Sequence, residues 1–206
     1  MVLKAIDKVA DTPIEIVAPS HGLIWRKDPC RIVNLYRQWA GYAAGKAERA
    51  ITLVYGSMYG NTEMMVEAVA RGITRTCVPL EIFDAAKTHP SYVLPSLWTR
   101  LGVVVGAPTY ETGLFHPIAH LLTIAVSKGV KNRKALRFGS YGWAGGAQRE
   151  LERIIDPAHW DLVDSFEFMG RPRREDLKGG EVRGEKFARI IENTQETSSC
   201  DGKGGP

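Results

Sequence analysis

From residue 50 onward, short apolar runs of strand length alternate with longer stretches that repeat apolar residues at helical spacing. The runs are rich in Val, Ile and Leu, as is typical of strands buried on both faces of a parallel sheet. We predict strands over residues 50–55, 78–83, 101–106, 134–139 and 160–168. We predict helices over residues 62–75, 117–128, 147–155 and 175–193, and a helical stretch to about Leu97 that Pro90 and Pro95 interrupt.

This alternation predicts an α/β domain with helices on both faces of a doubly wound, five-stranded parallel sheet. Right-handed crossovers leave few topologies, and we expect the strand order 2-1-3-4-5. In such sheets ligands bind where the strand order reverses, at the carboxyl ends of the strands. The loops that follow the first, third and fourth strands are therefore the places to look for a site.

The first 49 residues follow a different pattern, which predicts a short αβα extension. Its expected elements are a helix over 2–10, a strand over 14–17 and a helix from Asp28 to about Ala44. Asp28-Pro29 is a helix start, with an N-cap carboxylate before a proline at the first helical position. We divide the chain into residues 1–49 (an extension that ends in a linker), the domain over 50–193, and a disordered tail over 194–206, rich in Thr, Ser, Gly and Lys.

The loop Gly56-Ser-Met-Tyr-Gly-Asn-Thr62 connects the first strand of the domain to its helix. Such a loop points backbone N–H groups at one spot, and the positive end of the helix dipole supports them. Hydroxyl and amide side chains add donors, so the loop is a candidate phosphate cradle. It lacks the lysine of the nucleotide-triphosphate loop G-x-x-x-x-G-K-[ST]. The alternative is a tight turn with a Ser or Thr helix cap.

Two further loops, residues 107–113 and 140–146, carry Tyr110, Tyr141 and Trp143 among glycines and hydroxyl residues. A phosphate joined to a flat, hydrogen-bonding ring would suit all three loops, because aromatic side chains stack on ring faces and glycines allow close backbone approach. Flavin mononucleotide (FMN) is the economical choice. The alternative is that the aromatic residues only cover the end of the sheet.

The candidate FMN site draws on all three loops. The phosphate is assigned to Ser57, Met58, Tyr59, Gly60, Asn61 and Thr62. The ring is assigned to Pro108, Thr109, Tyr110, Glu111, Thr112, Gly113, Ser140, Tyr141, Gly142, Trp143, Ala144 and Gly145. Because the flavin would carry the electrons, no catalytic residue is nominated.

The composition and charge of the chain indicate which partners and which cellular compartment to expect. The net charge of +4 comes from scattered residues, with one cluster at Arg171-Pro-Arg-Arg174. We interpret this cluster as a solvated loop rather than as a nucleic-acid-binding patch. A further hypothesis is that the basic residues dock an acidic redox partner. The three cysteines are far apart and odd in number, which indicates a reducing compartment. With no signal peptide and no apolar run of membrane-spanning length, we expect a cytoplasmic protein.

The first loop resembles the flavodoxin pattern [ST]-x-[YFT]-G-x-[ST]. More narrowly, residues 1 to about 193 resemble the C-terminal part of a flavodiiron protein (A-type flavoprotein). Four runs carry the resemblance: Pro19-Ser-His-Gly-Leu-Ile-Trp-Arg26, Tyr55-Gly-Ser-Met-Tyr-Gly-Asn-Thr62, Gly106-Ala-Pro-Thr-Tyr-Glu-Thr-Gly113 and Phe138-Gly-Ser-Tyr-Gly-Trp-Ala-Gly145. The last run is the most specific, because simple flavodoxins usually lack it.

This resemblance implies a flavodoxin-like fold and electron transfer through FMN. In that family a metallo-β-lactamase-like domain precedes the flavodoxin-like domain and holds two irons that reduce dioxygen or nitric oxide. Electrons arrive from rubredoxin or from a nicotinamide or deazaflavin source. Family members are head-to-tail dimers, so the resemblance also implies a homodimer and a diiron-domain acceptor.

The chain departs from the family pattern because the metal signature H-x-E-x-D-H is absent. His21 matches the family's last iron ligand, but one histidine cannot hold two irons, so no metal site is predicted. His116 and His120 have the spacing of a zinc pair, and we interpret them as a surface pair. Residues 1–49 then resemble the remnant of a metallo-β-lactamase-like domain plus a linker helix. The sequence fits three origins of the chain: a fragment or truncated gene, a chain that pairs with a separate lactamase-like chain, and a stand-alone flavoprotein.

The function predicted from the sequence is therefore an FMN-binding electron-transfer module of flavodiiron type. It would pass electrons from a rubredoxin or an NAD(P)H-linked reductase to a diiron site that this chain does not contain. A stand-alone flavodoxin and an NAD(P)H-dependent quinone or flavin reductase are the alternatives, and a third is an interaction protein that binds no flavin. The chain alone is expected to be an electron carrier rather than an oxygen or nitric oxide reductase.

Overall fold

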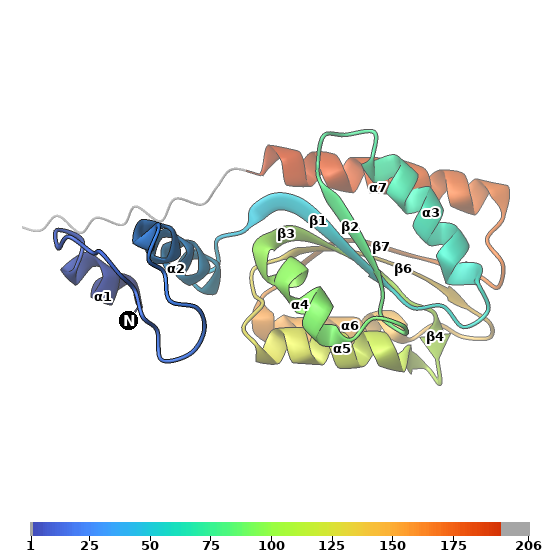
Figure 1. Cartoon of the computed structure of the whole chain (residues 1–206). Coiled ribbons are helices and arrows are strands. Elements are labelled where there is room, and N and C mark those ends of the chain that lie inside the picture. Colours follow the sequence, from blue (N-terminus) through green and yellow to red (C-terminus); the bar gives the residue numbers. More distant parts are fainter. Residues whose placement is uncertain (1, 195–206) are drawn as a thin grey trace, which may run out of the picture. The chain divides into compact units, whose positions relative to one another are not determined.

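The computed structural model describes residues 2–194 (Figure 1). Its helices are α1 (Val2–Lys8), α2 (Pro29–Ala43), α3 (Asn61–Ile73), α4 (Pro90–Thr99), α5 (His116–Ser127), α6 (Ala147–Ile155), the 3-10 helix η1 (Asp156–Ala158) and α7 (Arg174–Asn193). Its strands are β1 (Glu48–Tyr55), β2 (Leu80–Asp84), β3 (Arg100–Gly106), β4 (Thr109–Tyr110), β5 (Gly113–Leu114), β6 (Lys134–Tyr141) and β7 (Asp161–Met169). The tail predicted over 194–206 lies outside the described residues except for Thr194.

The chain divides into two compact units, one that ends at Lys46 and one that begins at Ala47. In the first unit, α2 begins as predicted, because the Asp28 carboxylate accepts a hydrogen bond from the Arg31 amide at 3.1 Å. The strand predicted over 14–17 is wrong. Val17 makes a single antiparallel bridge with Trp25, because the described part of this unit offers these residues no partner strand to extend the ladder.

In the second unit the strands form the expected doubly wound sheet, in the order β2-β1-β3-β6-β7 with all neighbours parallel. This confirms the predicted order 2-1-3-4-5, because β4 and β5 form a separate two-stranded sheet. Helices α3 and α7 cover one face of the large sheet, and α4, α5 and α6 cover the other (Figure 1). The apolar strand residues thus enter two separate cores, one on each face.

The sheet register brings the three predicted loops to one edge. Tyr55, the last residue of β1, lies beside Gly106, the last residue of β3, and Gly106 lies beside Phe138 of β6. Each of the three predicted loops begins within a few residues of these paired positions. This common edge positions the candidate site.

Two elements differ from the sequence prediction. Helix α4 is continuous over Pro90–Thr99 with Pro95 inside it, although an interruption was predicted there. Pro95 removes one backbone donor, and burial of Val93 and Leu97 in the core stabilises the helix in spite of this loss. The short hairpin of β4 and β5, within the loop predicted over 107–113, was not predicted. Among residues 2–194, no helix combines the length and the apolar character needed to cross a membrane.

Helices α3 and α7 approach so closely that glycine is required where they touch. A Cβ atom on Gly184 of α7 would lie 2.3 Å from the Val69 carbonyl oxygen of α3. By contrast, a Cβ atom on Gly179, also in α7, would meet no atom of residues 2–194 within 4 Å. The two glycines therefore occupy the same helix in opposite packing environments.

We predict opposite effects of the same substitution at these two positions. Gly184→Ala should lower the free energy of unfolding by about 1–3 kcal/mol, because the methyl group forces the helices apart. Gly179→Ala should raise it by about 0.5–1 kcal/mol, because alanine favours an exposed helix. Urea unfolding followed by circular dichroism measures both values. Equal effects of the two substitutions would contradict the close contact between α3 and α7.

Candidate functional site

The three predicted loops enclose a cavity of about 240 Å³ at the carboxyl edge of the sheet. Most of the predicted site residues line it. They are Ser57, Met58, Tyr59, Asn61, Thr62, Pro108, Thr109, Tyr110, Glu111, Ser140, Tyr141 and Gly142. Three loops that are far apart in the chain thus form one concave site, as expected for ligand sites in this class of sheet.

The loop between β1 and α3 has the geometry of an anion cradle. Gly60 caps α3 with a φ of +79°, a left-handed conformation that glycine adopts without strain. Among the described residues, no side chain caps this helix by a hydrogen bond, so the structure does not show the alternative of a Ser or Thr cap. Asn61 and Thr62, the first residues of α3, line the cavity, so the N-terminus of the helix lies at the cavity edge, where its helix dipole favours negative charge.

Hydroxyl groups from all three loops meet at the cavity. The Oγ1 atom of buried Thr62 lies 3.5 Å from the Oγ atom of Ser140. Ser57 Oγ and Thr109 Oγ1 are buried and have no hydrogen-bond partner among the described residues. Buried hydroxyl groups are normally hydrogen-bonded, so these two donors fit a ligand that carries acceptor oxygens.

The loop over 107–113 is shaped by the β4–β5 hairpin. Glu111 and Thr112, at its tip, have φ values of +47° and +64°, an uncommon conformation for residues other than glycine. The Glu150 carboxylate, from the first turn of α6, accepts a hydrogen bond from the Leu114 amide of β5 at 2.5 Å. Helix α6, which follows the 140–146 loop, therefore also holds the hairpin.

We predict that Glu150→Ala loosens the hairpin without unfolding the domain. Loss of the acceptor leaves the Leu114 amide unpaired, and its hydrogen exchange should become roughly tenfold faster, which corresponds to about 1.4 kcal/mol. Mass spectrometry of exchanged peptides over 109–115 measures this change. Glu152→Ala is the matched control, because Glu152 accepts a hydrogen bond from Gln148 of its own helix. An unchanged rate at Leu114 in Glu150→Ala would contradict the role of Glu150.

Some predicted residues lie outside the cavity lining. These are Gly60, Thr112, Gly113, Trp143, Ala144 and Gly145. The Trp143 side chain is 99% exposed and that of Tyr59 is 85% exposed, whereas Tyr110 lies edge-on against the His116 ring at 5.1 Å. The lining also includes Gly170, which was not predicted. Its position directly after the fifth strand is the signal that could have found it, because that strand ends at the same edge.

Electrostatics at the end of β1 keep one phenol neutral. Burial raises the pKa of Tyr55, and the carboxylates of Asp84 and Glu63 raise it further. The Tyr55 hydroxyl donates to Glu63 Oε1 at 3.4 Å. Tyr55 therefore stays protonated beside the cradle, and it adds no negative charge that would repel an anion.

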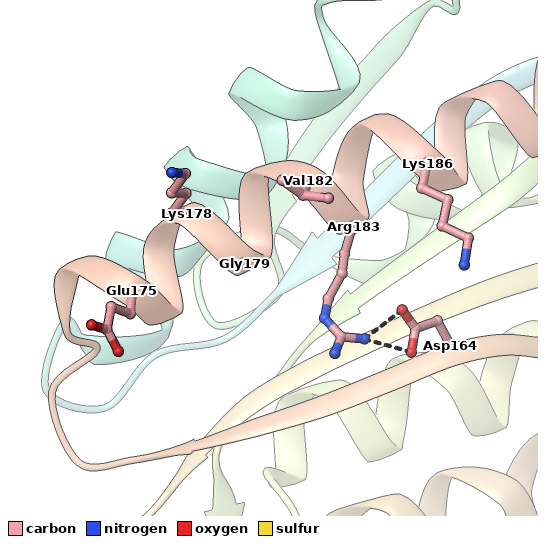
Figure 2. A pocket seen from close by; sticks show the side chains of 7 residues that line it. All are labelled: Asp164, Glu175, Lys178, Gly179, Val182, Arg183 and Lys186. Atoms are coloured by element: carbon pink, nitrogen blue, oxygen red, sulfur yellow. Dashed lines mark hydrogen bonds and ion pairs between the residues drawn. The ribbon is translucent and has the colours of Figure 1, made fainter.

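A second and larger hollow, of about 550 Å³, lies between α7 and β7. Figure 2 shows Arg183 of α7 reaching the carboxylate of Asp164, which it contacts through Nη1 at 2.6 and 2.8 Å. No residue that lines this hollow belongs to the three loops. Among the described residues, none that lines this hollow has a buried side-chain polar atom without a partner, unlike Ser57 Oγ and Thr109 Oγ1, so the smaller cavity is the better candidate for a ligand site.

Histidines do not form a metal centre in the part of the chain that the structure describes. Within residues 2–194 no three His, Cys, Asp or Glu residues gather in a way that could hold a metal ion. His116 and His120 are both exposed on α5, in agreement with their interpretation as a surface pair. His21 lies in the first unit and is exposed.

Comparison with known proteins gives a family match and a curated relative. The flavodoxin family profile matches residues 53–180. The anaerobic nitric oxide reductase flavorubredoxin of Escherichia coli K12 is 35% identical over 179 residues, which are 86% of this chain and 37% of that protein. The chain thus spans little more than a third of the length of this curated relative.

Two solved structures show the same fold. Rubredoxin oxygen:oxidoreductase from Desulfovibrio gigas superposes with a TM-score of 0.82 at 24% identity, over 93% of this chain and 48% of that chain. The Flv1 flavodiiron core from Synechocystis superposes with a TM-score of 0.66 at 29% identity, over 94% of this chain and 48% of that chain. The similarity covers the first unit as well as the second.

Proposed function

Because the chain belongs to the flavodoxin family and matches the flavodoxin-like part of flavodiiron proteins, we propose that it binds FMN and transfers electrons. The observation that carries this proposal is the pair of unpartnered buried hydroxyls, Ser57 Oγ and Thr109 Oγ1, in a cavity enclosed by three loops. The cavity also has the N-terminus of α3 at its edge. Together these features suit a phosphate joined to a ring system.

Each loop has a distinct role in the proposed site. Residues 57–62 hold the phosphate, through backbone N–H groups and the hydroxyls of Ser57 and Thr62. Residues 108–113 and 140–145 hold the ring, and Tyr110 and Tyr141 are the aromatic residues that these two loops contribute to the cavity lining. The flavin supplies the redox chemistry when bound, and the protein supplies binding, orientation and the electrostatic environment. No side chain is needed as a general acid or base.

The partners follow from the same proposal. The electron donor would be a rubredoxin or an NAD(P)H-linked reductase, and the acceptor would be a diiron site in a separate diiron-domain polypeptide. We propose that residues 1–49 are the remnant of a metallo-β-lactamase-like domain with its linker helix. Supporting this, the first unit exposes large apolar side chains such as Leu23 and Ile24, 79% and 52% exposed, as expected of a piece that packs against more protein.

The experiment that tests this function is an absorption spectrum combined with metal analysis. The chain incubated with FMN and then desalted should keep flavin bands at one flavin per chain and contain no iron, and dithionite should bleach the bands reversibly. Steady oxidation of NAD(P)H by the purified chain would instead favour a reductase. A colourless protein after incubation with FMN would contradict the proposal and favour an interaction protein that binds no flavin.

A further inference from the structure

Strand β6 carries a charged residue in the interior of the domain. The Arg137 side chain is 0% exposed. Side chains alternate along a strand, so Arg137 shares its face with Ala135, which belongs to the core beneath α4, α5 and α6. An arginine in this position must be compensated, because an isolated buried charge is strongly unfavourable.

Glu167 of β7 supplies the compensation. Its Oε1 atom lies 2.7 Å from Arg137 Nη1, and its side chain is 26% exposed. None of the three guanidinium nitrogens donates a well-aligned hydrogen bond to residues 2–194, so the contact is an ion pair. Burial lowers the pKa of Arg137, and Glu167 raises it again, more strongly than the more weakly interacting Glu152.

The other oxygen of Glu167 lies directly against the 140–146 loop. A Cβ atom on Gly145 would lie 2.6 Å from Glu167 Oε2. A flexible carboxylate could turn away from such a contact, but this one is held on its far side by Arg137. The backbone of the loop at Gly145 therefore lies on a carboxylate whose position is fixed by a buried arginine.

We propose that Glu167, held by Arg137, is a positioning residue. It supports the backbone of the 140–146 loop at Gly145 and so places this backbone against the flavin ring. This inference rests on the proposed FMN site, because the loop is its ring side. Glu167 acts through the loop, and it is not assigned a contact with the flavin. The role predicts that loss of the Glu167 charge frees the loop even when no ligand is bound.

The test compares Glu167→Gln with Asp164→Asn. Asp164 lies on the same strand and is also paired with an arginine, but it points toward α7 on the opposite face of the sheet (Figure 2). In the ligand-free protein, Glu167→Gln should accelerate hydrogen exchange of amides 142–146 about tenfold. It should also raise the dissociation constant of FMN about tenfold and change the visible circular dichroism of the bound flavin. Asp164→Asn should leave all three readouts unchanged.

A second variant keeps the inference testable if Glu167→Gln does not fold. Gly145→Ala leaves both charges in place and pushes a methyl group against the held carboxylate, so it should produce the same exchange and the same weakening of FMN binding. Normal loop exchange in Gly145→Ala, or in a folded Glu167→Gln variant, would overturn the inference. Failure of the wild-type chain to bind FMN would overturn the proposed function instead, and the exchange data on the ligand-free protein would still decide the role of Glu167.

Discussion

The Ser57→Ala/Thr62→Val variant is expected to bind FMN about 5- to 150-fold more weakly than the wild-type chain, a loss of about 1–3 kcal/mol. Both hydroxyls belong to the proposed phosphate cradle, and Thr62 is only 1% exposed. Without them, phosphate oxygens at the N-terminus of α3 would lose two donors in a site partly closed to water. Quenching of flavin fluorescence on titration measures the dissociation constant.

The matched control is Thr52→Val/Ser96→Ala. These residues form a buried hydroxyl pair, 2.7 Å apart, between β1 and α4. The control also removes two hydroxyls near the first strand, but none from the cavity lining, so it should affect stability and leave FMN affinity unchanged. Equal affinities of the cradle variant and the wild-type chain would contradict the assignment of the phosphate to residues 57–62.

The largest expected effect on stability comes from Glu167→Ala, which should lower the free energy of unfolding by about 3 kcal/mol. This substitution leaves the Arg137 guanidinium fully buried without its ion-pair partner. Breaking one side of a buried pair is costly for this reason, whereas removing both charges is often neutral. The double variant Arg137→Met/Glu167→Ala should therefore recover most of the loss.

Urea unfolding of the two single variants, the double variant and the wild type gives the coupling free energy between Arg137 and Glu167. Additive losses in the double variant would show that the two side chains act independently. They would contradict the structure's account of a mutually dependent pair.

The parts of the fold that could be predicted are those in which local pattern and burial agree. The run Ile51 to Val54 is apolar except for Thr52 and is wholly buried in the sheet, so its sequence indicated both the strand and its central position. The three loops could be predicted as one site because parallel strands end at a common edge. The loop at residues 57–62 could also be predicted to line the site, since a short polar loop there joins a buried strand to an amphipathic helix.

The missed features depend on tertiary contacts that no local pattern reveals. The apolar residues Ile14 and Ile16 suggest a strand, but a strand needs a partner, and Val17 finds only one pairing residue in the described part of the chain. The β4–β5 hairpin is too short for any periodicity, and Glu150, 36 positions after Leu114, fixes it. Arg137 is a charge within a strand pattern, and only the position of Glu167 shows how it is accommodated.

The exposure of Trp143 is a further feature of the proposed ring site that the sequence did not predict. Its sequence context, after Gly142 and before Ala144-Gly145, suggested an aromatic face for the flavin, but its side chain is 99% exposed and does not line the cavity. Tyr110 and Tyr141 do line the cavity. A residue type and its loop can be read from sequence, whereas the direction of a side chain on a glycine-rich loop cannot.

The most direct test of the central claim is a parallel titration of the purified chain with FMN and with riboflavin, which differ only in the phosphate. We predict that FMN binds at one molecule per chain and that riboflavin binds at least about tenfold more weakly, because the cradle contributes more than about 1.4 kcal/mol. Equal affinity for the two flavins would contradict the phosphate cradle. Binding of neither flavin would contradict the FMN site itself.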